Sequence, residues 1–315
     1  MTSTTADAAA ERFATEPWTA GIIGLGYVGL PLAVAATDRG LRVVGFDISS
    51  DRVATLSAGS SHVDDVSDAA LRRGLDAELV VTADPSRLEA CDAIFICVPS
   101  PLGRNRQPDL TYIETAAATV ASAARPGILI SLESTTYPGT TEDLIVPAIE
   151  AAGLNLDQDA FVAFSPERVN PGGGLAPHAI PKVVGGVTEA SGRVAAAAYG
   201  RLFEAVHTVS SSRAAEMAKL LENTYRAVNI ALVNEMAQLA HELDIDIWEV
   251  IEAASTKPFG FQAFYPGPGL GGHCIPIDPF YLSWKARQYD AVTRFIELAG
   301  EINTAMPEYV IERAM

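Results

Sequence analysis

The sequence has no apolar run near the ~20 residues that a membrane-spanning helix needs, although 49% of its 315 residues are hydrophobic. Basic residues are scarce as well, because 22 Lys and Arg stand against 39 Asp and Glu, for a net charge of −17. That balance argues against a nucleic-acid partner, whose phosphates require a surplus of positive charge. It still allows a phosphate-bearing small molecule, which backbone N–H groups and one or two cations can bind locally.

Cysteine is equally sparse. Cys91, Cys97 and Cys274 form no CxxC pair and no metal-ligand spacing, so we expect neither a disulfide framework nor a metal site. The first 18 residues have neither the cationic start nor the apolar block of a signal peptide. We therefore interpret residues 1–18 as a disordered leader and expect a reduced, cytoplasmic protein with no membrane partner.

Short apolar runs, several of them β-branched, recur along residues 19–209 and predict strands. The predicted strands are Thr19–Ile23, Arg42–Phe46, Leu79–Thr82, Ala93–Val98, Gly127–Leu132, Phe161–Phe164 and Lys182–Gly185. Most are separated by segments with helical periodicity, such as residues 110–124 and 141–152. Strands that alternate with helices predict an α/β domain whose parallel sheet is covered on both faces.

The character of the sequence changes after about Val209. Residues 214–243 form one long helical pattern without Gly or Pro, preceded by serines that can cap it. A helix of that length can extend beyond the α/β domain and support a dimer. A Gly/Pro-rich loop follows at residues 257–279, and residues 291–315 predict another helix, broken at most near Pro307.

A glycine-rich turn follows the first predicted strand and opens the first helix of the α/β domain, with the sequence Gly24-Leu25-Gly26-Tyr27-Val28-Gly29. Such glycines let the backbone approach a pyrophosphate at the helix N-terminus. Asp47 ends the second strand, 18 residues past Gly29, where a carboxylate can accept both ribose hydroxyls. An ordinary glycine-rich turn beside a surface Asp is the alternative, but the ordered set of strand, glycines, helix and acid favours a dinucleotide site.

The same region selects between cofactors. Asp47 would repel a 2′-phosphate, so NAD is favoured over NADP. Arg52 could accommodate that phosphate, although at five residues past Asp47 it could equally stack on the adenine. Val98-Pro99-Ser100-Pro101 ends a strand at the carboxyl edge of the sheet, where we expect the cofactor to pass. The predicted cofactor contacts are Gly24, Gly26, Tyr27, Val28, Gly29, Asp47, Arg52 and Ser100.

The loop Gly269-Leu270-Gly271-Gly272-His273-Cys274-Ile275-Pro276-Ile277-Asp278-Pro279 is the most informative stretch. Cys91 and Cys97 lie in apolar runs and are interpreted as core residues, whereas Cys274 has glycines before it and prolines after it. Glycines let backbone N–H groups face a ligand, and prolines stiffen the loop around the thiol. Composition alone leaves Cys274 as either a nucleophile or part of a tight structural loop. His273 suggests a thiol hydrolase, but adjacent side chains point apart and such an enzyme needs no dinucleotide.

Other polar residues stand near these motifs. Lys219 and Asn223 are four residues apart on one face of the long helix, and they either face a polar cavity or lie on a solvated face. Glu167 follows a predicted strand and is either a base or the ion-pair partner of a loop. Asp278, four residues past Cys274, could orient a water molecule or a cation.

Five ordered motifs resemble the UDP-glucose/GDP-mannose dehydrogenase family. They are GLGYVGLPLA from Gly24, ESTTYPGTT at 133–141, SPERVNPG at 165–172, AKLLENTYR at 218–226 and GPGLGGHCIPIDP at 267–279. The match runs from about Thr19 to the end of the chain. The resemblance implies an N-terminal, Rossmann-like, doubly wound parallel sheet that binds NAD over residues 19–209. An all-α central dimerisation domain over residues 210–315 is implied to follow it.

The resemblance also implies a chemistry. Two NAD molecules in turn would take hydride from C6 of a nucleotide sugar, and Cys274 would hold first a thiohemiacetal and then a thioester that water hydrolyses. Lys219 and the loop amides would favour the Cys274 thiolate. Lys219 and Asn223 would stabilise oxyanions at C6, and Asp278 would position water or Lys219. Glu167 would be the base in hydrolysis, and Thr135 would contact cofactor and water. The residues implied to line the substrate, in part from a neighbouring subunit, are Glu167, Arg168, Val169, Asn170, Lys219, Asn223, Phe264, Tyr265, Gly267 and Gly271.

The substrate branch is indicated by two regions. Glu167-Arg168-Val169-Asn170-Pro171-Gly172 stands where the UDP-glucose branch tends to carry Glu-Phe-Leu after Ser-Pro. Together with residues 257–261 and 265–269, it resembles the N-acetylhexosamine branch. UDP-N-acetylglucosamine is therefore the first choice and UDP-N-acetylmannosamine the second. The family continues into a UDP-binding domain of about 100 residues, which we expect to be absent from a chain that stops at Met315. Three alternatives remain: a non-catalytic fragment that binds NAD and dimerises, a member specific for UDP-glucose or GDP-mannose, and a one-step dehydrogenase of small hydroxy acids.

Overall fold

The computed structural model of the chain describes residues 2–103, 105–168, 179–272 and 274–315. The chain divides into two compact units, one formed by Met1–Pro101 with Asp109–Lys219 and the other by Leu102–Pro108 with Leu220–Met315. Helix α8 (Ser212–Glu242) begins in the first unit and continues into the second. Among the described residues, no helix is both long and apolar enough to cross a membrane.

The first unit is built on an eight-stranded sheet with the order β3-β2-β1-β4-β5-β6-β7-β8. The strands are β1 (Thr19–Ile23), β2 (Arg42–Phe46), β3 (Leu79–Thr82), β4 (Ala93–Ile96), β5 (Ile128–Leu132), β6 (Ala160–Phe164), β7 (Lys182–Gly186) and β8 (Val206–Val209). Neighbours from β3 to β6 are parallel, as predicted. The pair β6 and β7 is antiparallel, which departs from the predicted parallel sheet, and β7 and β8 are parallel again. Antiparallel neighbours, unlike parallel ones, need no crossover helix between them.

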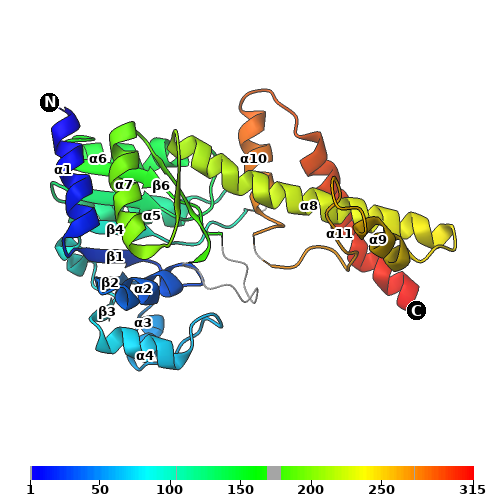
Figure 1. The fold of residues 1–315 in the computed structure, drawn as a ribbon, viewed down its shortest axis with the longest axis horizontal. Coiled ribbons are helices and arrows are strands. Elements are labelled where there is room, and N and C mark those ends of the chain that lie inside the picture. The colour runs from blue at the N-terminus through cyan, green and yellow to red at the C-terminus, as the bar shows by residue number, and fades with distance from the viewer. Residues whose placement is uncertain (1, 104, 169–178, 273) are drawn as a thin grey trace. The chain divides into compact units, whose positions relative to one another are not determined.

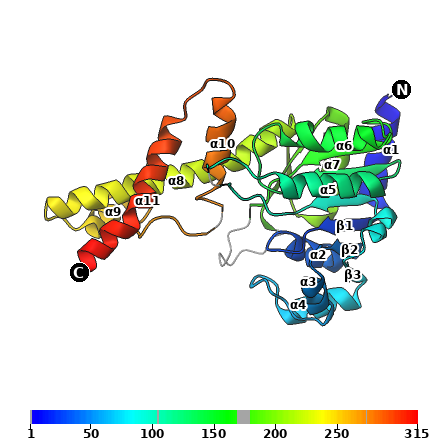
Figure 2. The ribbon, with the colours of Figure 1, turned by 180° about the vertical axis from the view of Figure 1, so that it is seen from behind.

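The sheet has a core on each face because successive strand residues point to opposite sides. In β4, Phe95 packs in one apolar cluster, whereas Ile94 and Ile96 pack in the other. Residues of α1, α2, α4 and α7 belong to the first cluster, and those of α5 and α6 to the second. Helix α7 lies in front of the sheet in Figure 1, and α5 lies in front of it in the reverse view of Figure 2. The bounds are α2 (Gly29–Asp38), α3 (Ser50–Ser57), α4 (Asp68–Asp76), α5 (Thr111–Ala123), α6 (Val146–Ala151) and α7 (Glu189–Leu202).

The predicted disordered leader is wrong, because Thr2–Thr15 form helix α1, which lies beside α7 (Figure 1). Phe13 is fully buried and its ring meets Trp18 edge to face, with centroids 5.4 Å apart. Arg12 donates hydrogen bonds to Asp92 at 3.1 Å and to the carbonyl of Gly127 at 2.8 Å. A few apolar residues and one arginine thus anchor α1 to the α/β unit, although its composition is that of a polar leader.

Strand β8 is absent from the predicted strands. It pairs with β7 at the edge of the sheet, and His207 and Thr208 are exposed. An edge strand with exposed polar residues lacks the continuous apolar run by which the buried strands were predicted.

The second unit is helical, as predicted. Beyond α8 it contains α9 (Ile247–Ser255), α10 (Asp278–Arg287) and α11 (Arg294–Ala314), the last of which runs unbroken through Pro307. Asn303 of α11 donates to the carbonyl of Ala227 at 3.0 Å and accepts from Asn234 at 3.0 Å, so buried amides join α11 to α8. The predicted loop at 257–279 lies between α9 and α10, and its last two residues open α10.

Candidate functional site

The glycine-rich turn lies at the carboxyl end of β1, beside the end of β4. Strands β1 and β4 are neighbours, and the chain winds away from them in opposite directions, which is where doubly wound sheets bind ligands. Gly24 has a positive φ of 90°, and a Cβ there would lie 2.6 Å from the carbonyl oxygen of Cys97. A Cβ on Gly29 would lie 1.8 Å from the carbonyl oxygen of Gly24, whereas a Cβ on Gly26 would meet no atom within 4 Å. The turn is therefore tight at Gly24 and Gly29 and open at Gly26, as a cradle for a pyrophosphate requires.

Asp47 connects the ends of the first two strands. Its carboxylate accepts hydrogen bonds from the amides of Leu25 and Ser49, each at 3.0 Å, and from Arg52 at 2.9 Å. Burial raises the pKa of Asp47, but these donors lower it more, so the net pKa lies below the ordinary value. A carboxylate that stays ionised beside an open glycine turn fits the ribose of a dinucleotide, and the side chains present therefore fit NAD. Arg52 pairs with Asp47, a contact that the sequence alone did not reveal.

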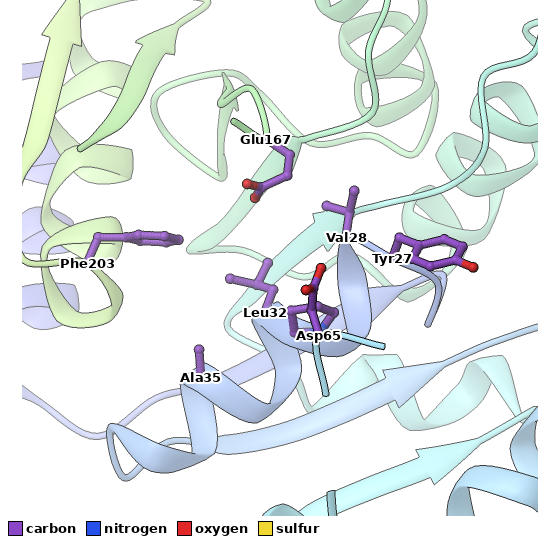
Figure 3. Close-up of a pocket in the computed structure, with 8 residues that line it drawn as sticks. Tyr27, Val28, Leu32, Ala35, Asp65, Glu167 and Phe203 are labelled. Atoms are coloured by element: carbon purple, nitrogen blue, oxygen red, sulfur yellow. The ribbon is translucent and has the colours of Figure 1, made fainter. Parts of the chain in front are cut away.

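Tyr27 and Val28, which follow the open Gly26, line a cavity of about 20 Å³ together with Glu167, Asp65 and other residues. Figure 3 shows the Glu167 side chain directed toward the N-terminal end of α2, where Leu32 and the preceding Val28 lie. A space of that size holds one water molecule. The structure thus places the predicted base Glu167 near the predicted cofactor turn, within the same unit.

Ser100 and Thr135 are both half-buried. Ser134 donates to the carbonyl of Val98 at 2.8 Å, which ties the loop that carries Thr135 to the segment that leads to Ser100. Both predicted cofactor contacts therefore follow adjacent parallel strands, β4 and β5, at the carboxyl edge of the sheet.

A buried ionic cluster of Glu133, Lys182 and Tyr199 adjoins Glu167, and none of these three was a predicted site residue. The Nζ of Lys182 lies 2.6 Å from Glu133 Oε2 and 3.2 Å from Glu167 Oε2. Tyr199 donates to Glu133 Oε1 at 2.6 Å. A signal was available, because Lys182 begins a strand that is otherwise apolar and Glu133 begins the ESTT motif, but their pairing spans 49 residues of sequence.

Glu167 is held at further points. Its Oε1 accepts from the backbone N–H of Arg168 at 2.7 Å, and its carbonyl accepts from the Nζ of Lys219. Arg168 also donates to the carbonyl of Pro181 at 2.9 Å. The structure thus brings together the predicted residues Glu167, Arg168 and Lys219. The predicted substrate contacts Val169 and Asn170 lie outside the described residues.

In the second unit, Cys274 is exposed and stands at the turn into α10. Its carbonyl accepts from the backbone N–H of Ile277 at 3.0 Å and of Asp278 at 2.8 Å. The buried carboxylate of Asp278 accepts a hydrogen bond from the side-chain amide of Asn223. Two of the predicted site residues, Asn223 and Asp278, are therefore paired in this unit, and the backbone of Cys274 contacts Asp278, while His273 lies outside the described residues.

The remaining predicted substrate residues belong to the loop between α9 and α10. Phe264 meets Tyr225 edge to face with ring centroids 5.7 Å apart, and Tyr265 stacks on Trp248 at 6.0 Å. The backbone N–H of Gly267 donates to Asn234 at 2.9 Å, so the amide cluster of α8 also fixes this loop. Gly271 is exposed, with open space where a Cβ would lie. Among the described residues, no group of three or more His, Cys, Asp or Glu side chains could hold a metal ion.

Comparisons with known proteins agree with this arrangement. Residues 19–203 match the NAD binding domain of the UDP-glucose/GDP-mannose dehydrogenase family, and residues 213–305 match its central domain. The UDP-N-acetyl-D-glucosamine 6-dehydrogenase of Pseudomonas aeruginosa is 38% identical over 297 residues, which cover 93% of this chain and 69% of that protein.

Solved structures give the same assignment. The UDP-D-ManNAc dehydrogenase of Pyrococcus horikoshii has a TM-score of 0.87 and 36% identity, over 93% of this chain and 70% of that one. A UDP-glucose dehydrogenase from Pyrobaculum islandicum has a TM-score of 0.85 and 28% identity, over 95% of this chain and 70% of that one. The chain therefore belongs to the UDP-glucose/GDP-mannose dehydrogenase family of nucleotide-sugar oxidoreductases, and residues 19–203 are its NAD-binding domain.

Proposed function

We propose that this protein oxidises the C6 CH2OH of a UDP-N-acetylhexosamine to a carboxylate, with NAD as hydride acceptor and Cys274 as covalent nucleophile. The observation that carries the proposal is the exposed Cys274 in the turn that leads into α10, next to the buried Asn223–Asp278 pair. A structural cysteine is typically buried, as Cys91 and Cys97 are. A thiol that the fold leaves exposed within a glycine- and proline-rich loop suits a nucleophile better than a packing residue.

NAD, when bound, supplies a hydride acceptor for each of the two oxidations. In the first, C6 loses a hydride and its hydroxyl loses a proton, which leaves an aldehyde. The Cys274 sulfur then bonds to that carbon, and the thiol proton passes to the carbonyl oxygen, which gives a thiohemiacetal. Loss of a second hydride from C6 and of the hydroxyl proton leaves a thioester. Water cleaves the C–S bond of the thioester, which gives the carboxylate and returns the thiol.

The polar side chains have separate tasks in this scheme. Lys219 and Asn223 would stabilise the negative oxygen that develops at C6 in each step. Asp278 accepts the Asn223 amide and would fix its orientation. Glu167 would take a proton from the water that attacks the thioester, and Thr135 would contact both the cofactor and that water.

The sugar assignment draws on the relatives. The proteins that resemble this chain at 38% identity include a UDP-N-acetyl-D-glucosamine 6-dehydrogenase and a UDP-N-acetyl-D-mannosamine dehydrogenase. UDP-N-acetylglucosamine is the first candidate substrate and UDP-N-acetylmannosamine the second. Phe264, Tyr265, Gly267 and Gly271 are proposed to line it.

We further propose a homodimer through α8. Leu232, Met236, Leu239 and Leu243, in α8 and just past its end, are all more than 40% exposed. Their spacing of four, three and four residues places them on one stripe, as in helices that pair with a second helix. Light scattering after gel filtration measures the mass of the particle in solution. Charged substitutions at Leu232 and Leu239 are expected to give a monomer. A monomeric wild type would contradict the proposal.

The test of the enzymatic proposal is a stoichiometry. The protein is mixed with NAD and, in separate reactions, UDP-N-acetylglucosamine, UDP-N-acetylmannosamine, UDP-glucose or GDP-mannose, and NADH per sugar consumed is counted. Two NADH per sugar are expected with an N-acetylhexosamine substrate, whereas one indicates a simple dehydrogenase. NAD binding without turnover of any sugar indicates a non-catalytic chain.

Two variants complete that test. Cys274→Ser is expected to abolish the second NADH and the uronate product, because the aldehyde can no longer become a thioester. Cys91→Ala removes a buried thiol and is expected to keep the stoichiometry of two. Full activity of Cys274→Ser would contradict the proposed mechanism.

A further inference from the structure

The first residue of β7, Lys182, is a charged side chain inside the α/β unit with only 3% of its surface exposed. Burying an ammonium group costs several kcal/mol unless charges and hydrogen bonds compensate it. Its Nζ finds two carboxylates, Glu133 Oε2 at 2.6 Å and Glu167 Oε2 at 3.2 Å. The aromatic rings of Tyr199 and Phe203 lie 5.7 and 5.1 Å from the same nitrogen. Lys182 therefore joins one wholly buried acid to one that lines a cavity.

The burial and the hydrogen bonds of Glu133 make it the residue that anchors Lys182. It stands just past β5, is fully buried, and accepts from Tyr199 at 2.6 Å as well as from Lys182. Tyr199 in turn shares a hydrogen bond of 2.8 Å with Ser131. Burial raises the pKa of Glu133 against the opposing effect of Lys182, whereas the two carboxylates outweigh burial and raise the pKa of Lys182. The ammonium thus stays charged between its two partners.

Glu167 differs from Glu133 because its side chain is 20% exposed and the residue lines the cavity near Val28. Its two oxygens have separate donors, the Arg168 amide on Oε1 and Lys182 on Oε2. Neutralising Glu133 requires only one ion pair, so the contact of Lys182 with Glu167 is not explained by the charge of Glu133. We infer that Lys182 is a positioning residue, which Glu133 anchors and which holds the Glu167 carboxylate in place and in its ionised form, ready to accept a proton.

This inference rests on the proposed function only where it makes Glu167 the base that activates water. The effect of Lys182 on the Glu167 carboxylate depends only on the contacts of Lys182 with Glu133 and Glu167, so it can be tested without any substrate. The charged and titratable groups around Glu167 come from several elements. They are Glu133 after β5, Lys182 of β7, Tyr199 of α7, Lys219 of α8, Cys97 after β4, Asp65 before α4 and the neighbouring Arg168.

The direct test is the titration of Glu167 in protein labelled with ¹³C at glutamate carboxyls, with Glu167→Gln to assign the signal. Lys182→Gln removes the cation and is expected to raise the Glu167 pKa by about 1–3 units. Glu133→Gln removes a neighbouring negative charge and leaves the ammonium to Glu167, so it is expected to lower that pKa. Lys182→Arg keeps the charge and is expected to leave the pKa near the wild-type value.

The Glu167 pKa is expected to rise in Lys182→Gln and to fall in Glu133→Gln. Structural damage would shift this pKa in the same direction in both variants, so the opposite signs distinguish the two explanations. Shifts of the same sign, or no shift in either variant, would overturn the inference. If Lys182→Gln does not fold, the Glu167 pKa in Glu133→Gln still tests the role of Lys182, because it is expected to fall. The circular dichroism of each variant is recorded to confirm that the fold is kept.

Activity gives a second readout where the protein turns over a nucleotide sugar. Lys182→Gln is expected to move the acidic limb of the kcat profile to higher pH with KM unchanged, and to accumulate the Cys274 thioester, seen by mass spectrometry. If the wild type oxidises no sugar, the proposed function fails while the titration still decides the role of Lys182. If the wild type is active and the acidic limb stays in place in Lys182→Gln, the inference fails while the proposed function stands.

Discussion

Glu216 accepts two hydrogen bonds from Thr141, one from its backbone N–H at 2.9 Å and one from its hydroxyl at 2.7 Å. The carboxylate is fully buried and also accepts from the amide of Gly139. Both partners belong to the segment that follows the ESTT motif, where Thr135 is a predicted cofactor contact. Glu216, in the second turn of α8, thus caps the helical segment that begins at Thr141.

This arrangement predicts a pH-dependent stability. Burial, opposed by the three donors, raises the pKa of Glu216 from 4.5 to about 7. The unfolded chain ionises this group at a lower pH than the folded one, so the free energy of unfolding falls as the pH rises from about 4.5 to about 7. The contribution over that window is about 3 kcal/mol.

Urea unfolding at several values between pH 4.5 and 8 measures this contribution. Glu216→Gln is expected to be destabilised by a constant amount, because its amide NH2 opposes the Gly139 N–H, and to lack the extra fall with pH. Glu235→Gln, at an exposed position of the same helix, serves as the control and should keep the wild-type slope. A Glu216→Gln slope equal to that of the wild type would contradict the assignment.

Helix α1 provides the second prediction. Phe13→Ala removes a fully buried ring from the contact with Trp18 and is expected to cost about 3–5 kcal/mol of stability. Glu11→Ala changes an exposed position of the same helix and is expected to change stability by less than about 0.5 kcal/mol. Chemical denaturation of both variants measures their free energies of unfolding. Equal values would indicate that packing of α1 does not stabilise the α/β unit.

The sequence predicts strands β1, β4, β5 and β6 well because each is a short apolar run that the sheet buries. It fails at α1, since the helix is stabilised by docking of Phe13 and Arg12, which local composition does not encode. It also fails at Lys182 and Glu133, because their pairing follows from the order of β5, β6 and β7 in the sheet. The glycine turn and Asp47 were predictable, since their spacing is a local consequence of the strand–turn–helix geometry.

The glycine turn yields a matched pair of variants. Gly24→Ala places a Cβ 2.6 Å from a backbone carbonyl oxygen at a positive φ, so it is expected to lose about 1–3 kcal/mol of stability together with NAD binding. Gly26→Ala meets no protein atom within 4 Å, so it is expected to fold like the wild type. Its methyl group would project where we expect the pyrophosphate, and NAD affinity should fall at least about tenfold.

Calorimetry measures both quantities for this pair, the melting temperature without ligand and the Kd for NAD. The informative outcome is a Gly26→Ala protein with the wild-type melting temperature and a weaker affinity for NAD. A general loss of structure would lower both the melting temperature and the affinity. Wild-type NAD affinity in Gly26→Ala would show that the open side of the turn does not contact the cofactor.

The three thiols provide the last prediction, which concerns the proposed nucleophile. Burial raises the pKa of the Cys91 thiol to about 12, and burial likewise raises the pKa of Cys97, so neither is expected to react with iodoacetamide at pH 7.5 in the folded protein. Cys274 is exposed and is expected to take up one equivalent of label, identified by peptide mass spectrometry. Cys274→Ser should take up none under the same conditions, whereas unfolding in guanidinium should expose the two buried thiols in both proteins. A substrate that forms the proposed thioester should protect Cys274 from the label in the presence of NAD, and equal labelling with and without substrate and NAD would argue against covalent catalysis at this residue.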